Sequence, residues 1–195
     1  MSKIVVIGID LAAKETNPSG WAVLKKKAVQ TCHLYHDTEI IECSVRLRPT
    51  VIAVDAPLSL PIHGAMRFAD KEMRRHGYSV FPPAFAAMKK LTLRAMKLAD
   101  AFRLRGFSVI EIHPLSTRKA LSMPLKEWGK IQTVFTHIGL GGDIKIRMLS
   151  AHEIDAVTAA ITGYLHQIGE TEQIGDDVEG VIVVPKRMEW RKLKL

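Results

Sequence analysis

The sequence has few cysteines and no long apolar run. Both shortages limit the classes of protein to which the chain can belong. Only two of its 195 residues are cysteines, Cys32 and Cys43, and their spacing fits neither a metal site nor a disulfide framework. The N-terminal apolar run IVVIGID is too short for a signal peptide or a membrane span. The chain also lacks internal repeats and low-complexity tracts. We therefore expect a reduced, cytoplasmic globular protein that does not associate with membranes.

Acidic side chains are scarce relative to basic ones. The chain has 20 Asp and Glu residues against 28 Lys and Arg, which gives a formal net charge of +8. The basic excess is concentrated in residues 63–105 and in the C-terminal tail KRMEWRKLKL. Positive potential of this kind speeds encounter with polyanions such as nucleic acid. A solubilising surface would carry the same charge, so the excess allows a nucleic-acid partner without requiring one.

The length and composition fit one domain with its own core. Apolar residues make up 47% of the chain and charged residues 25%, which is ordinary globular composition. A chain of this length is too short for two domains of typical size. We predict a single domain over 1–195, with a helical and irregular insertion at about 57–83 and helices at about 115–138. The sequence leaves the oligomeric state open, and a homodimer is one possibility.

Hydrophobic periodicity predicts a mixed α/β sheet flanked by helices. The three early strands are joined by short links, which indicates an antiparallel meander. The later strands are separated by helices, which indicates parallel crossovers. The predicted strands are 4–10, 20–26, 28–36, 50–57, 106–114 and 178–186, and the predicted helices are 37–48, 65–77, 84–105, 116–121, 126–137 and one from residue 150.

Two predicted strands end in aspartate. Asp10 ends the first strand and Asp55 ends the fourth. Parallel neighbours end at the same edge of a sheet, where α/β proteins form their binding crevice. If the two strands are adjacent, the carboxylates lie about 4.8 Å apart, one strand spacing. Such a pair repels itself unless a cation lies between, and hard oxygen ligands suit Mg²⁺ or Mn²⁺.

The helix that begins SAHEIDAVTAAITGYL carries a third aspartate. Asp155 shares a helical face with the small residues Ala159 and Thr162, and His152 lies beside that face. Small residues let the helix approach a backbone, so Asp155 would lie in buried surroundings where an unpaired charge is costly. We expect Asp155 to complete a cation site with the two strand-end aspartates, and His152 to be a further ligand or a proton carrier. Alternatively, Asp155 only interacts with the helix dipole.

Glu111 is a further acidic candidate, because glutamate is unusual in a buried strand unless it is paired. Glu111 and His113 in VIEIHP point to the same face of their strand. Glu111 is then either a fourth carboxylate of the site or the salt-bridge partner of Arg118.

Two arginines of one predicted helix, Arg67 and Arg74, share a face. They would clamp phosphates beside the acids, since the guanidinium fork matches phosphate oxygens, or they form a solvated charged face. The acidic segment IGDDVEG reads as a turn, with Glu179 as an additional candidate for the acidic cluster.

Several motifs together resemble a known family. They are GIDLA, DAPLSLP with a following R..D...R, VIEIHP....R, HEIDAV..A and IGD..EG..V.P, and they span Ile7 to Pro185. This set is similar to an uncharacterised domain family described as predicted nucleases with a ribonuclease H-like fold. The resemblance implies a ribonuclease H-like mixed sheet and a nuclease activity.

The resemblance extends to RuvC-type resolvases of the same superfamily. It matches Asp10, the H..D of His152 and Asp155, and Asp55, where the resolvase motif has glutamate. Ribonuclease H also has a glutamate on its first helix, for which Glu39 and Glu42 are both candidates. Glu111 has no counterpart in either set. The actin-like kinases share the sheet, but this chain lacks their paired glycine-rich phosphate loops.

These observations predict a metal-dependent nuclease that hydrolyses phosphodiesters of nucleic acid. One or two Mg²⁺ or Mn²⁺ ions would activate a water and stabilise the leaving oxygen. The alternatives are a non-catalytic nucleic-acid or partner-binding module on the same fold, and a nucleotide-handling phosphotransferase. The sequence leaves DNA or RNA and the strandedness open. The residues assigned are Asp10, Asp55 and Asp155 as metal ligands, His152 or Glu111 as proton carriers, and Arg67, Arg74 and Arg118 as phosphate ligands.

Overall fold

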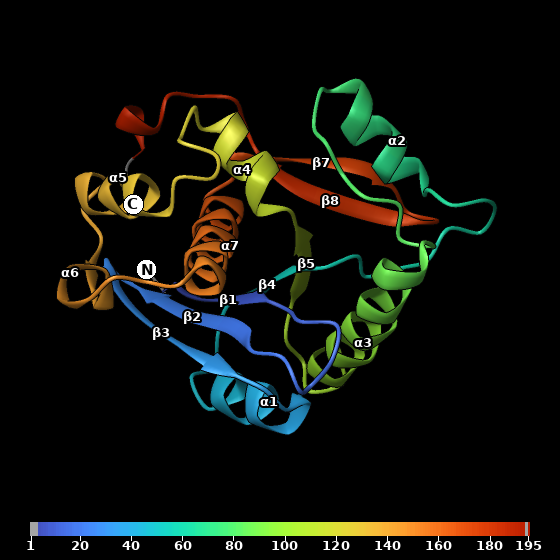
Figure 1. Cartoon of the computed structure of the whole chain (residues 1–195), viewed down its shortest axis with the longest axis horizontal. Helices are drawn as coiled ribbons and strands as arrows, with labels where there is room; N and C mark the ends of the chain where they lie inside the picture. Colours follow the sequence, from blue (N-terminus) through green and yellow to red (C-terminus); the bar gives the residue numbers. More distant parts are fainter. Residues whose placement is uncertain (1–3, 194) are drawn as a thin grey trace.

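A mixed eight-stranded sheet forms the centre of the protein (Figure 1). The computed structural model describes residues 4–193 and 195. The strands are β1 (Val5–Asp10), β2 (Ser19–Lys25), β3 (Ala28–Leu34), β4 (Val51–Asp55), β5 (Val109–Ile112), β6 (Gly141–Gly142), β7 (Thr171–Asp176) and β8 (Gly180–Pro185). Their order across the sheet is β6-β3-β2-β1-β4-β5-β8-β7.

The pairing of the strands follows from their connections. β1, β2 and β3 form an antiparallel meander, because the links between them are too short for a crossover. β4 pairs with β1 in parallel, and β5 and β8 continue the parallel part of the sheet. The fold class predicted from the sequence is therefore confirmed.

Helices cover both faces of the sheet (Figure 1). One face carries α7, which lies across β1, β2 and β4, and the opposite face carries α1 and α3. Within the described residues, no helix is long and apolar enough to cross a membrane. The helices are α1 (Asp37–Val45), α2 (Phe68–Arg75), α3 (Ala86–Arg103), α4 (Pro114–Ala120), α5 (Trp128–His137), α6 (Asp143–Ile146) and α7 (Ala151–Gln167).

Helix α7 lies unusually close to the sheet because glycines remove the side chains between them. A Cβ atom added to Gly8 of β1 would lie 2.0 Å from the carbonyl oxygen of Ala156. One added to Gly20 of β2 would lie 2.1 Å from the carbonyl oxygen of His152. Since real Cβ atoms do not approach backbone so closely, these two glycines set the height of α7 above the sheet. The first turns of α7 are thereby held against the ends of β1 and β2.

The structure departs from the sequence prediction at two places. β7 pairs antiparallel with β8 at one edge of the sheet, in a region predicted as only a turn. Its residues are mostly partly or fully exposed, so the buried-and-exposed alternation that marks a strand is missing. At the other edge, the glycine-rich loop contains the two-residue strand β6 and the one-turn helix α6, which are too short for a periodic signal.

Candidate functional site

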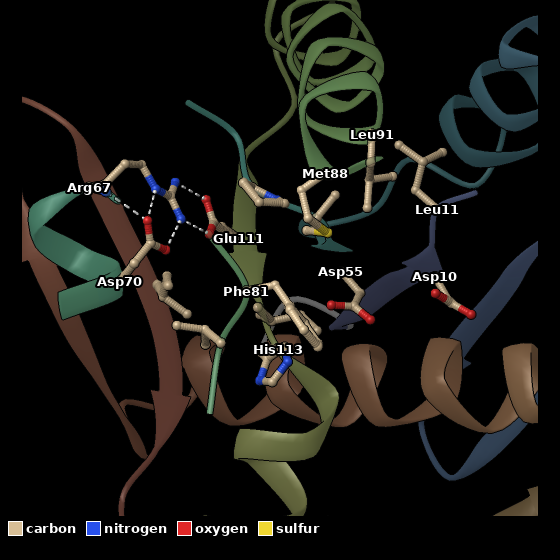
Figure 2. Close-up of a pocket in the computed structure, with 15 residues that line it drawn as sticks. Asp10, Leu11, Asp55, Arg67, Asp70, Phe81, Met88, Leu91, Glu111 and His113 are labelled. Atoms are coloured by element: carbon tan, nitrogen blue, oxygen red, sulfur yellow. Dashed lines mark hydrogen bonds and ion pairs between the residues drawn. The ribbon is translucent and has the colours of Figure 1, made fainter. Parts of the chain in front are cut away.

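Asp10 and Asp55 end neighbouring parallel strands and point to the same face of the sheet. They are direct partners in the register of β1 and β4. Two residues earlier on these strands, Gly8 lies against the backbone of α7 and Ala53 packs with Ala159 of α7. Because side chains alternate along a strand, both aspartates also project to the α7 face. Figure 2 shows the two carboxylates side by side above that helix.

The surroundings of Asp55 disfavour its charged form. Burial is the main cause that raises the pKa of this carboxyl group well above its ordinary range, and the negative charges of Asp10 and Asp155 raise it further. The positive charge of Arg118 opposes the rise without cancelling it. The site thus holds more negative charge than its own cations neutralise, which is the condition that a bound divalent cation relieves.

His152 contacts the first of these aspartates. Its Nδ1 lies 2.7 Å from Oδ2 of Asp10, and this hydrogen bond raises the pKa of the imidazole. The His33 ring lies edge-on to the His152 ring, with 6.2 Å between the ring centroids. The Nε2 atom of His33 is 2.7 Å from Oγ of Ser150, the residue that caps α7. His33 was missed by the sequence analysis, because only the β2–β3 register brings it to the start of α7.

Asp155 is paired with an arginine from α4. Arg118 donates a hydrogen bond from Nη1 to Oδ1 of Asp155, and its side chain is only 3% exposed. The guanidinium carbon lies 5.5 Å from the centre of the Trp128 ring, which fixes it from the other side. Of the two alternatives for Glu111, pairing with Arg118 is therefore wrong, and the Arg118 guanidinium neutralises Asp155 instead of facing solvent as the predicted phosphate ligand.

Because Asp10 and Asp155 are already paired, the three aspartates are not arranged to bind one metal ion together. In the part of the chain that the structure describes, no three His, Cys, Asp or Glu side chains are grouped to hold a metal ion. Asp155 is directed to Arg118 and Asp10 to His152, so the three expected ligands do not converge on one point. The oxygen donors of Asp10 and Asp55, which are direct partners in the strand register, still fit a hard divalent cation.

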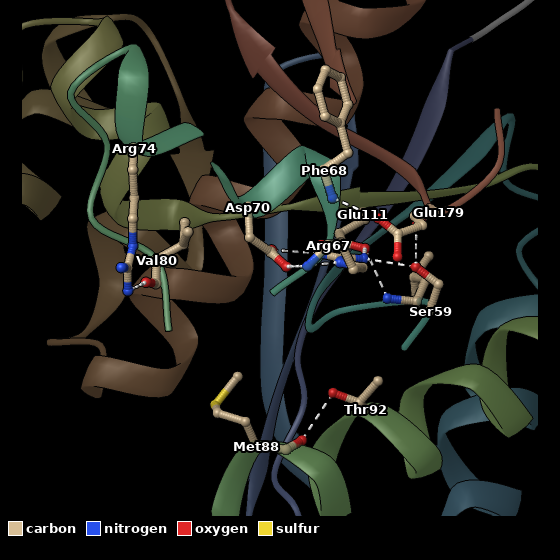
Figure 3. Close-up of polar contacts among 11 residues, drawn as sticks. Ser59, Arg67, Phe68, Asp70, Arg74, Val80, Met88, Thr92, Glu111 and Glu179 are labelled. Carbon is tan, nitrogen blue, oxygen red and sulfur yellow. Dashed lines mark hydrogen bonds and ion pairs between the residues drawn. The ribbon is translucent and has the colours of Figure 1, made fainter. Parts of the chain in front are cut away.

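Glu111 lies on the opposite face of the sheet from the aspartates. It pairs in register with Val54, which packs against the α1 and α3 layer. There it binds the guanidinium of Arg67, with Nη1 to Oε2 at 2.8 Å and Nη2 to Oε1 at 2.5 Å (Figure 3). The Glu111 carboxylate also accepts a hydrogen bond from the Leu58 amide at 2.7 Å. Glu111 is therefore placed away from the acids that it was expected to join.

Arg67 is fully buried and has no free donor. Its guanidinium donates five hydrogen bonds, to both carboxylate oxygens of Asp70, to both of Glu111 and to Oγ of Ser59. Five is the whole N–H capacity of an arginine side chain. The predicted phosphate-binding role of Arg67 is corrected on this ground, because the side chain is 0% exposed and saturated.

The remaining predicted residues serve local structure. Arg74 is exposed and donates from Nη2 to the carbonyl oxygen of Val80 at 3.2 Å. Glu179 accepts hydrogen bonds from the amides of Ile62 and Phe68, at 2.6 and 2.7 Å, and so caps the start of α2 (Figure 3). Glu179 therefore does not join the acidic cluster.

The first-helix glutamates are not at the site either. Helix α1, which carries Glu39 and Glu42, covers the face of the sheet opposite α7. Glu39 accepts hydrogen bonds from the amides of Tyr35 and His36, at 3.1 Å each, and caps its own helix.

A pocket of about 220 Å³ adjoins the two strand-end aspartates (Figure 2). Its apolar wall comes from Leu11, Phe81, Met88 and Leu91, and His113 contributes a polar atom. The sequence analysis did not identify this pocket, since its wall is assembled from the end of β1, the segment before α3 and α3 itself.

The topology and the acids at its edge define a ribonuclease H-like α/β protein. The chain belongs to the family described as "Protein of unknown function (DUF429)", whose model matches residues 8–121. The matched segment contains Asp10, Asp55 and Arg118 and ends before α7. The resemblance to an uncharacterised family with a RuvC-like fold is therefore confirmed.

A solved structure shows the same fold. The chain is similar to Thermus thermophilus RuvC in complex with a Holliday junction substrate, with a TM-score of 0.54 and 16% sequence identity. That similarity covers 85% of this chain and 96% of the RuvC chain. A second Thermus thermophilus RuvC structure has a TM-score of 0.47 and 18% identity, covering 85% of this chain and 97% of that one. No curated protein matches the chain.

Proposed function

We propose that this protein is a divalent-metal-dependent phosphodiesterase that acts on nucleic acid. The observation that carries the proposal is the pair Asp10 and Asp55, in register on adjacent parallel strands and facing the helix that bears His152 and Asp155. The fold supports it, because the similar RuvC structure is a complex with a Holliday junction substrate. The net charge of +8 is compatible with a polyanionic substrate.

Asp10 and Asp55 would hold Mg²⁺ or Mn²⁺, with Asp155 as a third ligand if it leaves Arg118. Such an ion, when bound, supplies Lewis-acid activation of a water and of the leaving oxygen. The chain itself supplies proton transfer. Asp10 holds Nδ1 of His152, so Nε2 is the nitrogen at which His152 accepts or gives a proton.

Exposed positive charge on α3, the helix that contributes to the pocket wall, would hold the substrate backbone. Lys89 and Lys90 are exposed on the turn of α3 that also carries the pocket residues Met88 and Leu91. These lysines replace Arg67, which is saturated, as the proposed phosphate contacts. Arg74 stays a candidate because its side chain is exposed.

The test is cleavage of a panel of labelled DNA and RNA strands, single and double, with Mn²⁺ and with EDTA. We expect cleavage that requires metal and that Asp10→Asn abolishes. Asp100→Asn is the matched control, because the Asp100 side chain is 67% exposed and lies on α3 away from the acids. Equal cleavage by the Asp10 variant and the parent would refute the proposal, provided that circular dichroism shows both to be folded.

A second candidate function is a non-catalytic nucleic-acid-binding module on the same fold. The observation in its favour is that Asp155 and Asp10 are already paired, with Arg118 and His152, in the described part of the chain. Titration with Mn²⁺ separates the two functions, because a ligand that binds only the folded state raises the melting temperature. A rise that is lost in Asp55→Asn supports the phosphodiesterase, and no rise at millimolar Mn²⁺ supports the binding module.

A further inference from the structure

The pocket beside Asp55 is suited to a flat apolar group, and not to a phosphate. Among the residues that the structure describes, the only arginine that lines it is Arg67, whose five donors are all used by Asp70, Glu111 and Ser59. Most of the other lining side chains are apolar, among them Leu11, Phe81, Met88 and Leu91. An anion would find no available cation among the described lining residues and would meet the carboxyl groups of Asp10 and Asp55.

Phe81 is presented to solvent at the edge of this pocket. Its side chain is 73% exposed, although it lines the pocket, whereas Val80 before it and Pro82 after it are buried. The carbonyl oxygen of Val80 is held by Arg74, and proline fixes the backbone angle at residue 82. The neighbours of Phe81 are therefore anchored while its ring contributes little to the core. Figure 2 shows the ring between Asp55 and His113.

His113 provides a neutral polar group on the same pocket. Burial, and then the charge of Arg118, lower the pKa of His113 to about 4, so the ring is uncharged at neutral pH. Its Nδ1 is 2.8 Å from Oγ of Ser116, which leaves Nε2 as the nitrogen available to a ligand. An uncharged nitrogen beside an aromatic ring suits the edge of a nucleobase, which enzymes of nucleic acid read by stacking and hydrogen bonds.

We propose that this pocket receives one unpaired nucleobase, stacked on Phe81 and hydrogen-bonded by His113, next to the phosphate that is attacked. This inference rests on the proposed function and names its substrate class as a strand with at least one unpaired nucleotide. A base held in a duplex cannot reach a pocket of this kind unless it leaves the stack. Phe81 and His113 are then binding residues, and Asp10 and Asp55 remain the acids of the reaction.

The experiment measures binding of two single-stranded probes in EDTA, where metal-dependent cleavage does not proceed. One probe is a fluorescein-labelled oligodeoxynucleotide, and the other has the same length and phosphates but only abasic sugars. We expect Phe81→Ala to weaken binding of the base-bearing strand about tenfold, because stacking on one aromatic side chain is of that size. Binding of the abasic strand should not change. In Phe81→Trp, which keeps an aromatic ring, the affinity for the base-bearing strand should stay close to that of the parent.

Phe85→Ala is the matched control. Phe85 is also an exposed aromatic residue, at 56%, but it does not line the pocket, so its removal should affect neither probe. The inference is overturned if Phe81→Ala leaves binding of the base-bearing strand unchanged, or weakens both probes equally. It is also overturned if the parent protein binds both probes alike.

The outcome separates this inference from the proposed function. Cleavage that depends on Asp10, together with binding that does not depend on Phe81, removes the base pocket and keeps the phosphodiesterase. Base-dependent binding through Phe81 without any metal-dependent cleavage keeps the pocket and removes the phosphodiesterase.

Discussion

Two polar clusters lie at the same edge of the sheet, on opposite faces, and their charges are balanced very differently. On the α3 face, Arg67 is enclosed by Asp70 and Glu111 and every N–H of its guanidinium has an acceptor. On the α7 face, Asp55 has its pKa raised by burial and by neighbouring acids. A saturated cluster holds the chain together, whereas a cluster with unbalanced charge is where a ligand can bind.

Removing the centre of the saturated cluster should have the largest effect on stability. Arg67→Met would leave two carboxylates buried without their cation, and breaking a buried pair in this way costs about 3–5 kcal/mol. Urea unfolding of the variant and the parent measures this loss. Arg75→Met is the control, because the Arg75 side chain is 73% exposed and its pair with Glu72 should contribute at most about 1 kcal/mol. Equal losses in the two variants would contradict our account of the cluster.

Moving α7 should disturb the acidic cluster and spare the saturated one. In Gly8→Ala the new methyl group would meet the carbonyl oxygen of Ala156, so α7 must shift, at a cost of about 1–3 kcal/mol. We expect lower stability by urea unfolding. We also expect Mn²⁺ to raise the melting temperature less than in the parent, because Asp155 and His152 belong to α7 and move with it. Gly129→Ala is the control, because its nearest contact would be the flexible end of Met148 at 3.8 Å. An unchanged metal response in Gly8→Ala would show that α7 does not contribute to the site.

The smallest effect is a pH dependence that comes from Asp55. Folding raises the pKa of this group, so its contribution to stability is present at low pH and is lost as the pH rises through the folded-state pKa. Without metal, Asp55→Asn should therefore be more stable than the parent at pH 8, with the difference shrinking toward pH 4. Thermal unfolding in EDTA across this range tests the sign, with Asp100→Asn as the exposed control. A variant less stable than the parent at pH 8 would mean that the acids are already neutralised.

Features of the fold that depend on a local signal could be predicted from the sequence. An apolar run closed by aspartate marked β1 and β4, and the short links between the early strands marked the meander. The pair Asp10 and Asp55 followed, because parallel neighbours end together. Glycine in β1 and β2 is a further local signal, because it marks the close approach of a helix.

Pairings between charged residues far apart in the chain could not be predicted from the sequence. Glu111 was predicted either to join the acidic site or to pair with Arg118, but its register with Val54 puts its carboxylate on the other face of the sheet. Arg67 appeared to be an exposed helical residue, but it is the buried residue that precedes α2. The local sequence cannot distinguish these arrangements, because an arginine reads the same whether it is buried between two acids or exposed to water.

By itself the sequence determined the order of most strands and helices and the place of two aspartates at one sheet edge, since periodicity and turn chemistry act over a few residues. The tertiary structure alone decided which carboxylates are neutralised. Whether a charge is balanced depends on contacts between segments as distant as Arg67 and Glu111 or Arg118 and Asp155. Those contacts are set by strand register and by the height of α7, and both require the whole sheet to be assembled.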